Sequence, residues 1–189
     1  MNVQLRNLLV LSLLAFPFAG ALADDYTDSI KVFRGAGESG QFFNKCYGYA
    51  VFPTIGKGGF VVGGAYGSGR VYANGEYVGD SSMTQVTLGW QLGGQAYSQM
   101  IFFENKRAFD EFTSGNFEFG VQATAVAITA GASAQAGTTG TSAGASGTQH
   151  SAKTVAKYSK GMAIFTVAKG GLMYEASVGG QKFSYTRKQ

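Results

Sequence analysis

Hydrophobic residues alternate with small or polar ones along much of this chain, which is the pattern of half-buried β-strands. The clearest case places Val86, Leu88, Trp90 and Leu92 between threonine, glycine and glutamine residues. Asn74-Gly75 separates two short apolar runs and predicts a tight hairpin turn. We expect strands at 49–53 (ended by Pro53), 58–66, 70–72, 76–78, 86–92, 100–103, 117–125, 161–168, 171–178 and 181–186.

Apolar residues at helical spacing occur in two short segments near the N-terminus. Glycines interrupt the spacing between these segments, so one continuous helix is not expected. We therefore predict helices at residues 26–33 and 38–46, from the positions of Ile30, Phe33, Phe42, Phe43 and Cys46.

A third helix is predicted at residues 106–113. Asn105 is a preferred N-cap residue, Phe109 and Phe112 share one helix face, and Gly115 lies just past the end. The chain is thus predicted to be mainly β, in the β-rich α+β class. It would form a single compact domain of short antiparallel strands with two or three short helices.

The first 23 residues have the features of a secretory signal peptide. One positive charge, Arg6, precedes the largely apolar stretch 8–18, and Ala21-Leu22-Ala23 matches a small-residue cleavage site. We expect a mature domain at 24–189 that is periplasmic or secreted, with membrane association left open. No cysteine lies near the cleavage site to receive a lipid anchor.

The net charge and the lack of a later long apolar run limit the classes of partner that we expect for this chain. Removing residues 1–23 takes away one arginine and leaves a net charge of +3, which is compatible with weak attraction to anionic surfaces. No later stretch approaches the roughly 18 consecutive apolar residues of a spanning helix. Basic and aromatic residues do not form a shared stripe, so we do not expect a nucleic-acid partner.

A sequence block near the start of the domain recurs near its end. Residues 48–60 read GYAVFPTIGKGGF and residues 161–172 read GMAIFTVAKGGL, and only Pro53 must be skipped to align them. We interpret this as an internal repeat of strand, lysine-bearing turn and strand. Two such hairpins could pair across a pseudo-twofold axis, with Lys57 and Lys169 at equivalent loop tips.

Residues 129–151 consist almost wholly of Ala, Gly, Ser and Thr and carry no acidic or basic side chain apart from His150. This composition allows either a flexible surface loop or close backbone packing. We expect a flexible loop at 137–149.

The groups that catalysis or metal binding requires do not converge in the sequence. His150 is the only histidine, Cys46 is the only cysteine, and no cluster has metal-ligand spacing. The glycine-rich segment 63–69 lacks the Gly-Lys-Ser/Thr of a phosphate-binding loop. We therefore expect no enzyme activity, no catalytic residue, no metal and no cofactor.

Four sequence blocks together resemble the SYLF domain family. They are residues 48–53 (GYAVFP), 57–69 (KGGFVVGGAYGSG), 89–95 (GWQLGGQ) and 158–161 (YSKG). Many members carry a Trp-Ser-x-Pro motif before the central strand, whereas residues 77–83 contain neither Trp nor Pro. The resemblance implies a mostly antiparallel β fold and lipid binding, with anionic phospholipid as the expected ligand in a bacterial envelope.

Candidate lipid-binding residues follow from charge and apolarity. Lysines attract anionic headgroups, and phenylalanines can enter the interface between water and hydrocarbon. The candidates are Lys57, Lys157, Lys160, Lys169, Phe33, Phe42 and Phe43. The alternative for the phenylalanines is core packing, and the alternative for the lysines is that they are ordinary solvated turn residues.

A second functional hypothesis is a structural or protein-interaction role in the periplasm or outer membrane. The small-residue segment would then serve as the contact surface. The sequence leaves the lipid species and the oligomeric state open.

Overall fold

The computed structural model describes residues 19–59, 62–88, 95–128, 156–169 and 178–189. Its elements in chain order are α1 (Ala19–Gly35), α2 (Gly37–Gly40), the 3-10 helix η1 (Gln41–Asn44), β1 (Gly48–Gly59), β2 (Val62–Ala73), β3 (Glu76–Leu88), β4 (Gln95–Phe103), α3 (Lys106–Phe112), β5 (Phe117–Glu118), β6 (Val126–Ile128), β7 (Met162–Lys169) and β8 (Lys182–Arg187).

One mixed sheet holds the eight described strands in the order β5-β8-β3-β2-β1-β4-β7-β6. The strand pairs are antiparallel except β6 with β7, which is parallel. β4 does not continue the β1-β2-β3 meander but returns to the free edge of β1. This confirms the predicted class, a β-rich single domain of mainly antiparallel strands with short helices.

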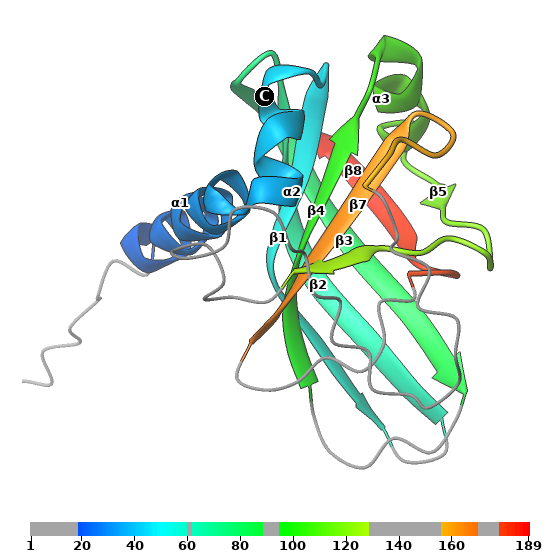
Figure 1. Ribbon diagram of the computed structural model, residues 1–189. Coiled ribbons are helices and arrows are strands. Elements are labelled where there is room, and N and C mark those ends of the chain that lie inside the picture. Colours follow the sequence, from blue (N-terminus) through cyan, green and yellow to red (C-terminus); the bar gives the residue numbers. More distant parts are fainter. Residues whose placement is uncertain (1–18, 60–61, 89–94, 129–155, 170–177) are drawn as a thin grey trace, which may run out of the picture.

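The two faces of the sheet carry different helices. Figure 1 shows α1 and α2 on one side of the strands and α3 on the other. We call these sides the α1 face and the α3 face. Both faces bury apolar side chains, because alternate residues of a strand point to opposite sides.

On the α1 face, the apolar core lies over β1, β4 and β7 and is closed by one phenylalanine from each of α1 and η1. Its buried members are Phe33, Phe42, Tyr49, Val51, Met100, Phe102, Ala163, Phe165 and Val167. On the α3 face, the core extends across the sheet as far as β8. Its largest side chains include Phe52, Ile55, Met83, Ile101, Phe103, Phe112 and Phe183.

The predicted N-terminal helices form with shifted boundaries. Residues 26–33 lie inside α1, which extends from Ala19 to Gly35 and so overlaps the predicted leader. The predicted helix 38–46 is divided between α2 and η1 and ends at Asn44. The expected break lies at Ala36, whose extended backbone precedes α2.

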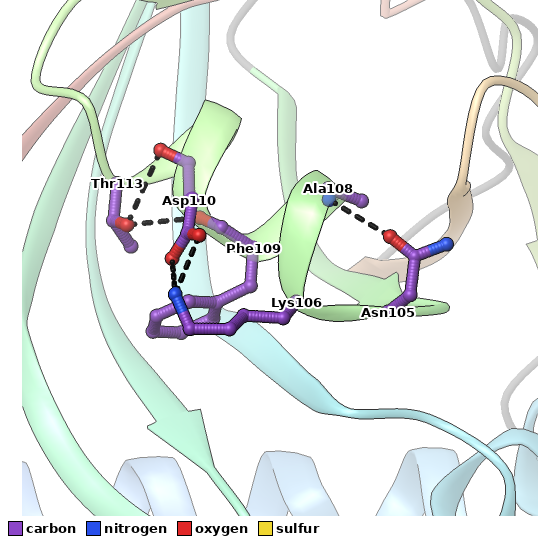
Figure 2. Close-up of polar contacts among 6 residues, drawn as sticks. All are labelled: Asn105, Lys106, Ala108, Phe109, Asp110 and Thr113. Atoms are coloured by element: carbon purple, nitrogen blue, oxygen red, sulfur yellow. Dashed lines mark hydrogen bonds and ion pairs between the residues drawn. The ribbon is translucent and has the colours of Figure 1, made fainter.

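The predicted helix 106–113 is confirmed as α3, and Figure 2 shows the contacts that bound it. The Ala108 backbone N–H donates to the Asn105 side-chain oxygen at 3.1 Å, which is the N-cap contact. At the other end, the Thr113 hydroxyl donates to the Phe109 carbonyl at 2.9 Å. Gly115 follows with φ of 98°, a conformation that glycine adopts without strain.

The Asn74-Gly75 hairpin is confirmed. Both residues have positive φ, 51° and 85°, as a type I′ turn requires, and they join β2 to β3. The strands predicted at 70–72 and 76–78 are short pieces of these longer strands. The prediction of one strand at 58–66 was wrong, because β1 ends at Gly59 and β2 begins at Val62.

Pro53 does not end the first strand, which corrects the predicted boundary at 53. The register of β1 shifts between Val51 and Thr54 on β2, and between Phe52 and Ile55 on β4. A β-bulge at this point needs no ladder hydrogen bond from the missing proline N–H. The Ser98 hydroxyl donates to the Pro53 carbonyl at 2.7 Å and satisfies the acceptor left there.

The strand predicted at 117–125 is present only as β5, residues 117–118. The chain turns after Gly120, where the Ala123 N–H donates to the Gly120 carbonyl at 2.9 Å. Phe119 and Ala125 nevertheless pack into the core of the α3 face. The alternation in the sequence therefore reflects burial against the sheet and not a ladder within it.

The two copies of the sequence repeat flank β4. Tyr49 of β1 lies opposite Phe102, whereas its counterpart Met162 in β7 lies opposite Phe103. Because Phe102 and Phe103 point to opposite faces, matched positions of the two copies also point to opposite faces. A pseudo-twofold axis along β4 describes this relation, and the skipped Pro53 coincides with the bulge.

The remaining predicted strands are partly covered by the structure. The prediction at 100–103 is confirmed within β4, that at 161–168 as β7 and that at 181–186 as β8. The strand predicted at 86–92 continues β3 as far as Leu88, and its end lies outside the described residues. The strand at 171–178 and the loop at 137–149 also fall on residues that the structure does not describe, apart from Val178.

Candidate functional site

Lys57 and Lys169 lie at the same end of the sheet, one on each side of β4. Lys57 is opposite Gln95, and Lys169 is opposite Ala96. Two strand spacings, about 10 Å, separate their backbones. Since Gln95 and Ala96 are consecutive, Lys57 points to the α3 face and Lys169 to the α1 face. The two ammonium groups therefore lie on opposite faces of the sheet, at the same end of the strands.

The contacts of Lys169 among the described residues do not include a carboxylate that would neutralise its charge. Its Nζ donates to the Thr54 hydroxyl at 2.8 Å, and the side chain is exposed. A hydroxyl is a neutral partner, so the ammonium keeps its full positive charge and further donors. Lys57 is half-exposed and lies on β1, which is separated from β7 by β4.

The strand segments around these lysines carry no carboxylate. The sequence from Ser81 to Phe103 has no charged residue, and Lys57 is the only charge between residues 54 and 69. Tyr66 and Val86 are exposed here by 58% and 77%. We call this part of the sheet the Lys57–Lys169 end. It combines positive charge with exposed apolar surface.

Lys157 and Lys160 lie at the opposite end of β7. Lys160 occupies a turn with φ of 51° just before the strand begins at Met162. Seven residue steps along β7 separate this turn from Lys169, about 23 Å. The structure thus brings together Lys57 with Lys169 and Lys157 with Lys160, but it does not bring the two pairs together.

Acidic groups surround the Lys157 and Lys160 end. The neighbouring α3 carries two exposed ion pairs, Lys106 with Asp110 at 2.6 Å and Arg107 with Glu111 at 3.6 Å. Figure 2 shows the first of them along the helix surface. The Glu104 backbone N–H also donates to the Gly161 carbonyl at 2.9 Å, which places another carboxylate-bearing residue beside this turn.

The three candidate phenylalanines pack against the α1 face. Phe33 is fully buried and Phe42 is 6% exposed, with the Phe42 ring 5.1 Å from that of Phe165. Phe43 is half-buried and its ring lies under the Arg34 guanidinium, 4.4 Å away. Phe33 and Phe42 serve the core in this conformation and present no ring to a membrane. The structure favours the alternative reading given for them.

The described residues hold no group of three or more His, Cys, Asp and Glu side chains suited to a metal ion. Cys46 is half-buried, and burial raises the pKa of its thiol, so less of the reactive thiolate is present at neutral pH. His150 lies outside the described residues. Within the residues that the structure describes, none of the helices is apolar over a length that would cross a bilayer.

Comparison with known sequences places the chain in a family. Residues 84–188 match the sequence model of the Ysc84 family, described as Las17-binding protein actin regulator. This chain is a member of the Ysc84 (SYLF) family. The match includes β3 from Thr84, β4, α3, β7 and β8, and it contains the 89–95 and 158–161 blocks that carried the resemblance. The blocks at 48–53 and 57–69 precede the matched region.

A similar curated SYLF-family protein is Beta cell expansion factor A from Aeromonas veronii. It is 30% identical over 161 residues, which cover 83% of this chain and 52% of the relative. The chain therefore spans about half the length of that relative.

One feature of this SYLF domain was not predicted from its sequence. The Arg70 guanidinium lies between two tyrosine rings, 4.3 Å from Tyr26 and 5.1 Å from Tyr77. Burial and the hydrogen bond that Tyr77 donates to Asp80 at 2.7 Å raise the pKa of Tyr77 to about 12. The residues come from α1, β2 and β3. Only the Asn-Gly hairpin signal, which brings β2 beside β3, could have indicated part of this cluster.

Proposed function

We propose that this SYLF domain is a non-enzymatic protein of the bacterial envelope that binds anionic phospholipid surfaces through its Lys57–Lys169 end. The observation that supports this most is that, among the described residues, Lys57 and Lys169 make no ion pair and lie beside the exposed Tyr66 and Val86 on strand segments without a carboxylate. An anionic leaflet attracts each nearby lysine by about 1 kcal/mol. The exposed Tyr66 and Val86 would gain from partial removal from water.

The proposal fixes an orientation for the domain. Lys57 and Lys169 point to opposite faces, so neither face alone presents both to a flat surface. With the strand ends directed at the membrane, both lysines reach the headgroups together.

The test is co-sedimentation of the purified protein with neutral and anionic vesicles. We expect binding to the anionic vesicles alone and its loss at high salt, because screening shortens the electrostatic range from about 10 Å at 0.1 M to about 3 Å at 1 M. Failure to bind anionic vesicles at low salt would rule out the proposed function.

A matched pair of double variants tests the site. Lys57→Ala/Lys169→Ala should weaken binding about 30-fold, since two lysines contribute about 2 kcal/mol. Lys157→Ala/Lys160→Ala removes the same charge from the opposite end and should change binding much less. Equal losses would show that net charge alone drives association, and a larger loss in the second variant would reverse the orientation.

The family description names a Las17-binding actin regulator, and this favours protein interaction as a second candidate function. The surface proposed for it is the small-residue segment within 129–151. Deletion of residues 137–149 should abolish capture of a protein partner while vesicle binding persists. Loss of neither activity on deletion would remove this segment from consideration.

A further inference from the structure

Among the described residues, helices cover only part of the α1 face of the sheet. α1 and η1 close the apolar core above β1, β4 and β7, whereas the same face of β2, β3 and β8 carries polar side chains. An open hollow of about 370 Å³ lies between α1 and these strands. Its side chains are Tyr26, Ser68, Asp80, Ser82, Ser184 and Thr186.

Strand register arranges these side chains in two rows across the sheet. Ser68, Ser82 and Ser184 are directly opposite one another on β2, β3 and β8 and form the first row. Arg70, Asp80 and Thr186 form the next row in the same way. Residues paired across strands share a face, and neighbouring strands lie about 4.8 Å apart. The floor of the hollow is therefore a regular array of short polar groups.

The serine row is linked by hydrogen bonds. The Ser82 and Ser184 hydroxyl oxygens are 2.7 Å apart, and the Ser82 backbone N–H donates to the Ser184 hydroxyl at 3.3 Å. Each hydroxyl can donate one hydrogen bond and accept others, so the row keeps capacity toward a ligand above it. The Tyr66 hydroxyl lies 3.4 Å from that of Ser68 and extends the polar strip along β2.

The second row supplies charged groups of both signs. Among the described residues, the Arg70 guanidinium makes no hydrogen bond or ion pair, and it lies 4.3 Å from the centre of the Tyr26 ring and 5.1 Å from that of the Tyr77 ring. Asp80 accepts from Tyr77 through Oδ2 and keeps Oδ1 for another donor in the same part of the chain. Asp80 lines the hollow itself, whereas Arg70 lies beside Asp80 in the same row but is not one of the lining residues.

We propose that this hollow is a binding site for a neutral oligosaccharide. Sugar hydroxyls can donate to the Asp80 carboxylate and to the serine oxygens, and they can accept from the serine and Thr186 hydroxyls. The Tyr26 ring at the rim offers an amphipathic surface for the apolar face of a pyranose. The polar floor suits neither an acyl chain nor apolar peptide side chains, and Asp80 opposes an anionic headgroup. The hollow adjoins the Lys57–Lys169 end, because Tyr66 contacts Ser68 and Thr54, the partner of Lys169, lies opposite Ser68, but sugar binding in the hollow does not depend on the proposed lipid binding.

The first experiment is an NMR titration of the purified, ¹⁵N-labelled protein with chitotriose, maltotriose and cellotriose. At least one should shift amide signals of residues 68–70, 80–82 and 184–186 in a saturable manner at millimolar concentration. Ser68→Ala/Ser82→Ala should weaken that binding about tenfold, because two neutral hydrogen bonds are lost. Ser114→Ala, which removes an exposed hydroxyl beyond α3, should leave it unchanged. No shift with any of the three sugars would overturn the proposal, and so would equal affinity in the double variant and the control.

Substitution of Asp80 distinguishes a sugar from an anion. Asp80→Asn keeps an oxygen for the Tyr77 hydroxyl but removes the negative charge. A sugar should bind several-fold more weakly to this variant, whereas inorganic phosphate should bind more tightly. Phosphate binding in the hollow that strengthens in Asp80→Asn, without sugar binding, would assign an anion site instead. Vesicle sedimentation of Ser68→Ala/Ser82→Ala should match that of the unsubstituted protein, so failure of one proposal is distinguishable from failure of the other.

Discussion

The two faces of the sheet both bury apolar residues, but their cores differ in aromatic and polar content. The α1 face collects aromatic rings beneath two helical segments, and Phe102 alone contacts the rings of Phe42, Phe43 and Phe165. The α3 face spreads its core across the sheet and includes a buried polar group. There Gln99 and Gln181 exchange hydrogen bonds at 2.8 and 3.1 Å through their amide groups. On the α1 face the buried Ser39 and Ser98 hydroxyls donate only to backbone carbonyls, whereas the α3 face also holds a hydrogen-bonded pair of buried side-chain amides.

This difference matters for function because it leaves neither core free to contact a ligand. Phe33, Phe42 and Phe43, the aromatic residues that suggested membrane contact for the N-terminal segments, pack against the α1 face instead. In the part of the chain that the structure describes, the surfaces that remain for ligand contact are the strand ends and the polar part of the α1 face. The following predictions test the two faces separately.

The largest effects should come from Phe102 and Phe103, neighbours on β4 that are both fully buried. Phe102→Ala and Phe103→Ala should each lower the free energy of unfolding by about 3–5 kcal/mol, through lost burial and a residual cavity. Hydrogen exchange should separate them. Phe102→Ala should speed exchange in residues 30–44, and Phe103→Ala should speed exchange in α3, whose Phe112 ring is 4.9 Å away. Faster exchange in both regions in both variants would show that the faces unfold as one unit.

Tyrosine titration gives the next effect. Burial raises the pKa of Tyr97 on the α3 face to about 12, from an ordinary value of 10.0, and the Gln181 amide donates to its hydroxyl at 3.1 Å. A raised pKa in the folded state means that stability is complete below pH 10 and is lost as pH rises from 10 to 12. The loss should be about 2–3 kcal/mol. Tyr97→Phe should remove this part of the alkaline loss in urea unfolding measured from pH 9 to 12.

Tyr158, which packs against the α1 face, is the matched control for the hydrogen bond of Tyr97. Burial also raises the pKa of Tyr158 to about 12, but its hydroxyl has no partner in the described part of the chain. At pH 7, Tyr97→Phe should cost about 1 kcal/mol because Gln181 loses an acceptor, whereas Tyr158→Phe should cost nothing or stabilise. A greater cost for Tyr158→Phe at pH 7 would mean that its hydroxyl has a partner in solution.

Local signals predicted the elements that are bounded by short-range contacts. Asn74-Gly75 specified its hairpin through backbone conformation, and Asn105 specified the start of α3 through its own side-chain oxygen. The sequence repeat correctly matched the positions of Lys57 and Lys169 along two strands, but both lysines lie within β1 and β7 and not at loop tips. The flanking of β4 by the two copies was not predictable, since it depends on contacts between residues 38 to 73 positions apart.

Where prediction failed, one physical cause imitated another. Alternation at 117–125 indicated a strand, but burial of Phe119 and Ala125 against a sheet produces the same pattern without a ladder. Pro53 indicated a strand end, but a bulge removed the need for its N–H. The polar hollow could not be foreseen because Tyr26 reaches it from a helix while its other groups come from three strands.

The N-cap of α3 should contribute an intermediate amount to the α3 face. Asn105→Ala leaves the Ala108 N–H without its side-chain acceptor and should cost about 1 kcal/mol in urea unfolding. Asn44→Ala, at the exposed end of η1 on the other face, is a control in which no cap contact is removed. If the two substitutions cost the same, α3 is stabilised by packing of Phe112 and not by its cap.

The smallest effect should come from the cation that lies over the α1-face aromatics. Arg34 is exposed and its guanidinium lies 4.4 Å from the Phe43 ring, an arrangement that contributes about 0.5–1 kcal/mol at an exposed site. Arg34→Met keeps an unbranched apolar stem of similar length and removes the charge, so the free energy of unfolding should fall by this amount. Lys31→Met, which removes an exposed charge paired with Asp28 on the same helix, should change it less. A smaller loss for Arg34→Met than for Lys31→Met would mean that the Arg34 guanidinium adds nothing to the packing of the aromatic rings on the α1 face.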